Sequence, residues 1–198
     1  MLPASGRGAA ADLLVVGLGN PGAEFEGTRH NLGAEVVTLL AARRGQRLRP
    51  EKGTRSVVAQ SRFDGRLVVV AVPQTYMNES GLAVSALVKR FRVPAPDRLV
   101  VVHDEFDLPS GRVKVKVGGG TAGNNGLKSV HAHLHDPGYL RVRIGIGKPA
   151  GREAGADYVL HRPGRAERDA LDVAVEVIAL EGVDVAMLRF NGDAPSIG

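Results

Sequence analysis

The feature that most constrains the fold is an apolar run that stops at a turn of glycine, asparagine and proline. The run covers residues 13–18 and is followed directly by residues 19–22, which read GNPG. A short apolar run bounded by turn residues is typical of a central strand, in a sheet that is covered on both faces. Ligands of open α/β sheets bind beyond the carboxyl ends of such strands. Asn20 and His30 follow this strand, so we expect both at a binding site.

Strand and helix patterns alternate along the rest of the chain. Strands are predicted where apolar residues run together or alternate with polar ones, and helices where they recur every three to four residues. The strands expected on this basis cover residues 13–18, 56–62, 67–72, 99–102, 112–117 and 140–146. The expected helices cover residues 31–45, 81–91, 127–135 and 165–180, with a short one near 184–190. Asp64–Gly65 predicts a hairpin between two strands, and residues 46–54 read as a basic loop.

This alternation predicts an α/β protein. We expect a single three-layer α/β/α domain with a twisted, mostly parallel mixed sheet. A chain of 198 residues is most simply one domain, with residues 1–11 as a flexible tail and residues 12–198 as the catalytic domain. No apolar run approaches membrane-spanning length, and the first twelve residues lack the features of a signal peptide. We therefore expect a cytoplasmic protein that does not contact a membrane.

The charge of the chain favours an anionic partner. The net charge is +5 and the sequence pI is about 9.9, a balance that suits nucleic acid or a nucleotide. Lys114 and Lys116 are expected to share one face of a strand, and Arg141 and Arg143 one face of another. Aromatic residues make up only 4% of the chain, which argues against binding by many stacked bases.

Several familiar motifs are present only in part. Residues 17–22 match G-x-G-x-x-G, but no helix begins at that turn, as a dinucleotide site requires. A phosphate-binding loop is not complete, because Leu127 separates the glycine from the lysine that should follow it directly. No serine lies in a G-x-S-x-G motif, so the nucleophile turn of serine hydrolases is absent from the sequence. Of His131, His133 and His135, only two can share a helix face, so no metal site is expected. A nucleotide-dependent enzyme stays open as an alternative.

Polar side chains also follow each of the other predicted central strands. They are Tyr76, Asn78, Asp104, Asn124 and Asn125, and the apolar Met77 lies among them. A neutral imidazole such as that of His30 is a suitable general base near pH 7, and a carboxylate such as that of Asp104 would orient it. Carboxamides donate hydrogen bonds to an oxyanion or to a peptide backbone. The joint occurrence of these side chains at strand ends favours a binding site in which His30 acts as a general base.

Five stretches together carry a resemblance to a known family. GLGNPGAEFEGTRHN, PQTYMNESG, HDEFDLPSG, GGGTAGNNGLKS and RVRIGIGKP, in this order and spacing, resemble bacterial peptidyl-tRNA hydrolases over roughly residues 13–190. The resemblance implies an enzyme that cleaves the ester between a peptide and the terminal ribose of tRNA. It implies peptidyl-tRNA as the partner, no metal and no other cofactor. We expect the enzyme to be a monomer.

The resemblance also assigns roles to individual residues. The catalytic positions fall on His30, Asp104 and Asn20. The positions implied to bind substrate fall on Phe25, Tyr76, Met77, Asn78, Asn124 and Asn125. Those implied to bind the tRNA phosphates fall on Lys114, Lys116 and Arg143. The chain departs from the usual family pattern at Phe25, Thr121, Ala122 and Asn124, which leaves a non-catalytic RNA-binding paralogue as the alternative.

Overall fold

A seven-stranded sheet forms the centre of the computed structural model, which describes residues 10–63, 65–149 and 154–180. The order of the strands across the sheet is β2-β3-β4-β1-β5-β7-β6. Their bounds are β1 Leu13–Gly17, β2 Arg49–Glu51, β3 Ser56–Phe63, β4 Arg66–Pro73, β5 Leu99–Glu105, β6 Val113–Val117 and β7 Leu140–Gly145.

The middle of the sheet is parallel and its edges are antiparallel. β1 pairs in parallel with both β4 and β5, and β5 pairs in parallel with β7. β3 runs antiparallel to β2 and β4, and β6 runs antiparallel to β7. Within the described residues, β3 and β6 therefore oppose the common direction of the other strands, which confirms the predicted mixed sheet. The predicted hairpin is the β3–β4 pair.

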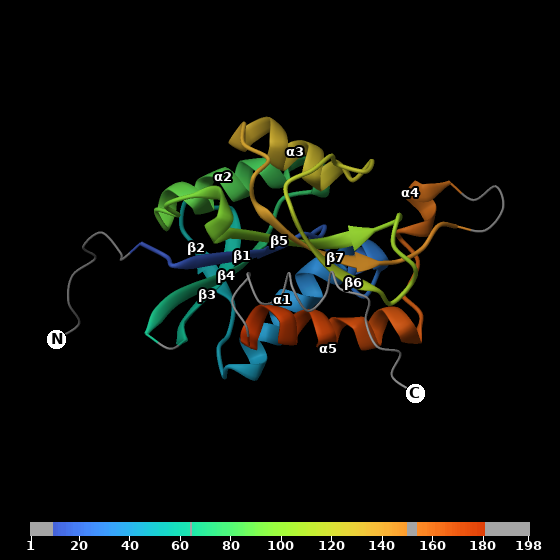
Figure 1. The fold of residues 1–198 in the computed structure, drawn as a ribbon, viewed down its shortest axis with the longest axis horizontal. Helices are drawn as coiled ribbons and strands as arrows, with labels where there is room; N and C mark the ends of the chain where they lie inside the picture. Colours follow the sequence, from blue (N-terminus) through green and yellow to red (C-terminus); the bar gives the residue numbers. More distant parts are fainter. Residues whose placement is uncertain (1–9, 64, 150–153, 181–198) are drawn as a thin grey trace.

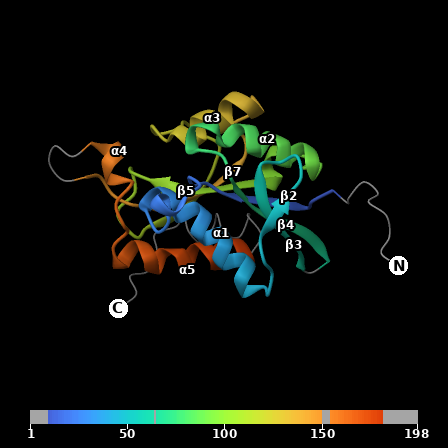
Figure 2. The same ribbon diagram turned by 180° about the vertical axis from the view of Figure 1, so that it is seen from behind.

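Helices cover both faces of this sheet (Figure 1). α1 (Leu32–Arg43) and α5 (Arg165–Leu180) lie on one face, and α2 (Ser80–Arg90) and α3 (Asn125–Leu134) lie on the other, as the view from behind also shows (Figure 2). The short α4 (Gly155–Tyr158) lies beyond the ends of β5 and β7. The described residues also form 3-10 turns at Ala23–Phe25, Arg29–Asn31, Met77–Glu79 and Pro96–Arg98. The three-layer α/β/α fold is confirmed.

The central strand β1 is buried from both sides, which explains its continuous apolar sequence. Val15 packs into the core beneath α1 and α5, whereas Leu14 and Val16 pack into the core beneath α2 and α3. α1 passes very close to the sheet, since a Cβ atom on Gly33 would lie 2.2 Å from the carbonyl oxygen of Val102. This close approach brings the residues just before α1 to the carboxyl end of β5.

Some elements differ from the sequence predictions. β2 lies inside the stretch expected to be a loop, β5 continues past residue 102 to Glu105, and α4 was not predicted. Ala11, at the end of the expected tail, is buried, and its N–H donates to the carbonyl oxygen of Phe91 at 2.8 Å. Residues 1–9 and the helix expected near 184–190 lie outside the described residues. No helix among the described residues has the length and apolar character needed to cross a membrane.

Candidate active site

His30 and Asp104 form the centre of the candidate site. His30 lies in the 3-10 turn before α1, and Asp104 lies near the carboxyl end of β5. Nδ1 of His30 is 3.0 Å from Oδ2 and 3.1 Å from Oδ1 of Asp104. The Asp104 side chain is 2% exposed and that of His30 13%. These contacts make Nδ1 the ring nitrogen that faces the carboxylate.

The surroundings of His30 act on its protonation in opposite directions. Burial lowers the pKa of the imidazole because it disfavours the charged form, while the hydrogen bond and the negative charge of Asp104 raise it. The net result is a pKa above the ordinary value of histidine. The ring is therefore a stronger base than an exposed histidine, and its charged form is stabilised by Asp104.

A carboxamide holds Asp104 from the other side. Nδ2 of Asn124 donates to Oδ1 of Asp104 at 3.0 Å, and Oδ1 of Asn124 accepts from the N–H of Leu127 at 3.1 Å. The second contact caps the N-terminus of α3. Both ends of the Asn124 side chain are thus engaged within the protein, and helix α3 is coupled to the acid.

Asn20 is held in place by a residue that the sequence analysis did not single out. Asn31 accepts from the N–H of Asn20 at 2.8 Å and donates to its carbonyl oxygen at 2.9 Å. The side-chain oxygen of Asn20 accepts from the N–H of Met77 at 2.7 Å. Asn31 follows His30 directly in the sequence, which could have marked it as a site residue. The sequence pattern assigned this position only to the start of a helix, so its role was missed. Asn20 therefore joins the loops that follow β1 and β4.

The remaining residues predicted to bind substrate differ in their exposure. Phe25 and Tyr76 pack edge to face with ring centroids 6.4 Å apart, and Tyr76 is 55% exposed. Asn78 is exposed in the 3-10 turn before α2, and Asn125 is exposed as the first residue of α3. Met77 is only 4% exposed and packs with the core beneath these helices. The exposed side chains are the ones free to meet a ligand.

The predicted basic residues divide into exposed and paired groups. Lys116 is exposed and Lys114 is half-buried on β6. Arg143 is paired with Glu105, with its Nε 3.0 Å from Oε2. Arg141, on the same face of β7, is 2% exposed and bonds to the carbonyl oxygens of the glycine-rich loop (residues 118–124). The expected solvated face of arginines on β7 is therefore largely buried.

Among the residues that the structure describes, no group of three histidine, cysteine, aspartate or glutamate side chains is arranged to hold a metal ion. His131, one of the three histidines for which no metal site was expected, packs its ring against Tyr139, with centroids 5.6 Å apart.

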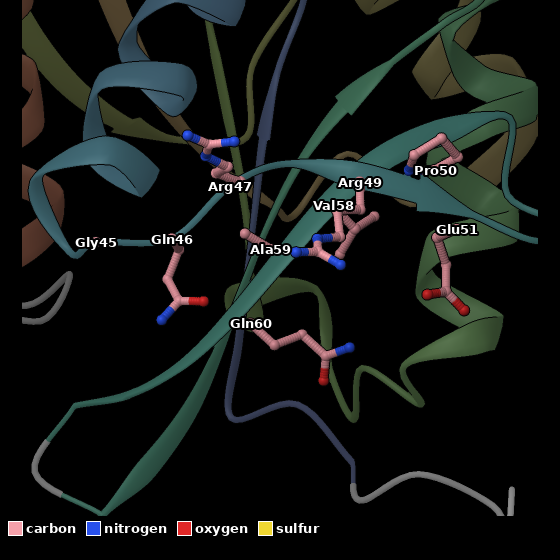
Figure 3. A pocket seen from close by; sticks show the side chains of 9 residues that line it. All are labelled: Gly45, Gln46, Arg47, Arg49, Pro50, Glu51, Val58, Ala59 and Gln60. Carbon is pink, nitrogen blue, oxygen red and sulfur yellow. The ribbon is translucent and has the colours of Figure 1, made fainter.

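A separate hollow lies away from these residues, on the outer strands of the sheet (Figure 3). It has a volume of about 570 Å³ and contains none of the predicted site residues. Its lining residues are Gly45, Gln46, Arg47, Arg49, Pro50, Glu51, Val58, Ala59 and Gln60. The hollow offers no base paired with a buried acid, so the candidate site is the His30 cluster.

This chain is similar to a well-populated group of proteins. It matches the peptidyl-tRNA hydrolase family model over residues 14–196. It is 51% identical over 166 residues to the peptidyl-tRNA hydrolase of Nocardia farcinica, covering 84% of this chain and 86% of that protein. It is 44% identical over 195 residues to that of Cutibacterium acnes, covering 90% and 97%. The crystal structure of peptidyl-tRNA hydrolase from Acinetobacter baumannii is similar, with a TM-score of 0.83, 34% identity and coverage of 96% and 100%.

Proposed function

The chain belongs to the peptidyl-tRNA hydrolase family and is an enzyme of that type, and we propose that His30 and Asp104 perform its reaction. The substrate is peptidyl-tRNA, in which an ester joins a peptide to the terminal ribose of tRNA. His30 acts as the general base and Asp104 as the group that orients it. The observation that carries this proposal is the contact between a buried carboxylate and Nδ1 of a partly exposed imidazole.

The reaction requires one proton to be moved twice. Nε2 of His30 takes a proton from a water molecule while the water oxygen bonds to the ester carbon. The tetrahedral intermediate collapses when the bond between that carbon and the ribose oxygen breaks. The imidazolium then returns its proton to the ribose oxygen, so the products are a peptide carboxylic acid and tRNA with a free hydroxyl.

Asp104 and the nearby carboxamides support this step. The carboxylate keeps the proton of neutral His30 on Nδ1, which leaves the lone pair of Nε2 free, and it stabilises the imidazolium that forms. Asn124 keeps Asp104 in position through their shared hydrogen bond. Asn20 is bonded to Asn31, the neighbour of His30, and its Nδ2 makes no hydrogen bond to a described residue, so we assign that group as a donor to the oxyanion.

Two further groups of residues would bind the two halves of the substrate. Asn78 and Asn125 present uncharged amides that suit a peptide backbone of any sequence, and Phe25 and Tyr76 present apolar rings. Lys114, Lys116 and Arg143 would bind tRNA phosphates, Arg143 while it remains paired with Glu105. We further propose that the enzyme acts as a monomer in the cytoplasm, where translation produces the substrate.

The central test is the substitution His30→Ala. We expect the rate of peptide release from purified peptidyl-tRNA to fall by at least about a hundredfold, because a positioned general base contributes on the order of 10²–10⁴. The binding of tRNA should be unchanged. His135→Asn is a suitable control, since His135 is an exposed histidine at the end of α3 whose left-handed backbone asparagine tolerates. Normal turnover in His30→Ala would refute the assignment, whereas loss of turnover in both variants would point to misfolding.

A further inference from the structure

The segment between α4 and α5 runs along the residues that carry His30. The N–H of His30 donates to the carbonyl oxygen of Val159 at 2.9 Å, and the N–H of Arg29 donates to that of His161 at 3.0 Å. Residues 29–30 and 159–161 are far apart in the sequence, yet their backbones are joined by two hydrogen bonds. The backbone of His30 is therefore held by a part of the chain that is far from it in the sequence.

A buried ion pair reinforces this junction. Nε of Arg29 lies 2.7 Å from Oε1 of Glu167, in the first turn of α5, and the Glu167 side chain is 2% exposed. The other carboxylate oxygen of Glu167 accepts from the N–H of Gly164. Arg29 also donates from a second nitrogen to the carbonyl oxygen of Tyr158 at 3.4 Å. A buried charge pair with additional hydrogen bonds fixes the geometry of its partners, whatever its net effect on stability.

Tyr158 connects the same junction to the strand that carries Asp104. The guanidinium carbon of Arg29 lies 4.2 Å from the centroid of the Tyr158 ring. The Tyr158 hydroxyl donates to the carbonyl oxygen of Ile146 at 2.6 Å, and the N–H of Ile146 donates to the carbonyl oxygen of Glu105 at 3.0 Å. Glu105 is the neighbour of Asp104 in β5. One tyrosine thus contacts the residue before His30 and, through Ile146, the residue after Asp104.

We propose that Arg29, Tyr158 and Glu167 form a clamp that sets the distance between His30 and Asp104. The inference rests on the proposed function, since it takes these two residues as base and orienting acid. All three clamp residues are positioning residues, because each acts through His30 or Asp104. A base and its partner must be held to within about 0.5 Å of the productive geometry, and the clamp ties the two supporting segments to one another.

The substitution Glu167→Gln tests the clamp, with Asp172→Asn as its matched control. Both changes remove a carboxylate of α5 that pairs with an arginine, but Asp172 pairs with Arg43 on the surface, at the other end of α1. For Glu167→Gln we expect kcat to fall about tenfold with KM within about twofold, since a small misplacement of a reacting group costs rate rather than binding. Asp172→Asn should match the unsubstituted enzyme.

The pH profile separates positioning from a loss of folded protein. A displaced His30 loses the hydrogen bond that raises its pKa, so the acid limb of kcat should move to lower pH in Glu167→Gln. Loss of folded protein would lower the rate equally at every pH and leave the limb in place. Amide exchange at Arg29 and His30 should also become faster in Glu167→Gln and stay unchanged in Asp172→Asn.

Tyr158→Phe provides a second variant in case Glu167→Gln does not fold. It removes only the hydroxyl that bonds Ile146 and keeps the ring beneath Arg29. We expect kcat to fall severalfold with KM unchanged and the acid limb to move in the same direction. Unaltered kcat and acid limb in Tyr158→Phe, or equal values for Glu167→Gln and Asp172→Asn, would overturn the clamp. His30→Ala tests the proposed function separately from the clamp, because full activity in His30→Ala would overturn the proposed function itself.

Discussion

The carboxyl group of Asp104 receives hydrogen bonds from two segments that are far apart in the sequence. His30 approaches from the turn before α1 and Asn124 from the loop before α3, and both contacts are close to 3.0 Å. The Asp104 side chain is 2% exposed, so its carboxylate is largely removed from solvent. In the proposed mechanism the carboxylate therefore sets both the orientation and the charge of the imidazole.

Asp104→Asn is the residue-scale prediction that follows. We expect kcat to fall about a hundredfold, since an amide neither stabilises the imidazolium nor selects the required tautomer. Burial of His30 would then act without the opposing charge, so the pKa of His30 should fall and the acid limb of the pH–rate profile should move to lower pH. The measurement is kcat against pH. An acid limb at the original pH would show that another group sets it.

The same pair affects stability with a definite sign. The pKa of His30 is raised in the folded protein, so its contribution to stability is present below the ordinary value of 6.5 and is lost as pH rises through the raised value. His103, fully buried beside Asp104, has a lowered pKa because burial disfavours its charged form. His103 therefore affects stability in the opposite direction to His30. As pH falls below 6.5 the unfolded chain binds a proton at His103 more readily than the folded chain does, so stability is lost.

At the scale of elements, one arginine of β7 secures the glycine-rich loop. Arg141 is 2% exposed, donates to the carbonyl oxygen of Gly120 at 2.6 Å and also bonds that of Gly119. The loop crosses the face of the sheet from β6 to α3 and ends at Asn124, the partner of Asp104. Arg141 therefore contacts the site only indirectly. It holds the backbone of a loop that has few side chains to pack and that positions Asn124.

Arg141→Ala tests this role at the level of the element. The carbonyl groups of the loop lose a charged donor, so we expect unfolding free energy to fall by about 1–3 kcal/mol. Amide exchange and proteolysis within residues 118–124 should increase more than elsewhere. Lys128→Ala is the comparison, because Lys128 is exposed on α3 just after the loop. Unchanged exchange in the loop of Arg141→Ala would contradict the role.

At the scale of the whole molecule, excess positive charge and the position of the lysines decide how a polyanion would bind. The net charge is +5, and Lys114 and Lys116 lie on the edge strand β6, beside the glycine-rich loop. Arg66 is exposed at the start of β4, at the opposite end of the strands from His30. If the tRNA lies over β6, only the lysines should contribute to its binding.

The double substitution Lys114→Ala with Lys116→Ala is expected to raise KM severalfold and leave kcat nearly unchanged. Each phosphate contact that is lost should reduce the slope of log affinity against log salt by roughly 0.7–0.9. Arg66→Ala removes one positive charge and should leave the slope unchanged. The measurement is KM and tRNA affinity at several salt concentrations. An equal effect of Arg66→Ala would indicate general attraction by net charge instead of a defined path.

Much of the fold was predictable because its signals are local. The apolar run of β1, the hairpin at Asp64–Gly65 and the amphipathic pattern of α5 depend on residues close together in the chain. β2 was missed because its three residues, Arg-Pro-Glu, show no apolar alternation and pair only at the edge of the sheet. The last residues of β5 were missed because a central strand rarely carries His103, Asp104 and Glu105 together.

The sequence by itself determined the layers, the order of the loops and the residues offered for catalysis, because turn and strand chemistry acts over a few residues. Only the tertiary structure decided which of those residues meet. It brought Asn31 to Asn20, Glu167 to Arg29, and Arg141 beneath the glycine-rich loop instead of into solvent. Those contacts join distant segments across layers, and whether a charged side chain is buried there depends on what the rest of the chain packs over it.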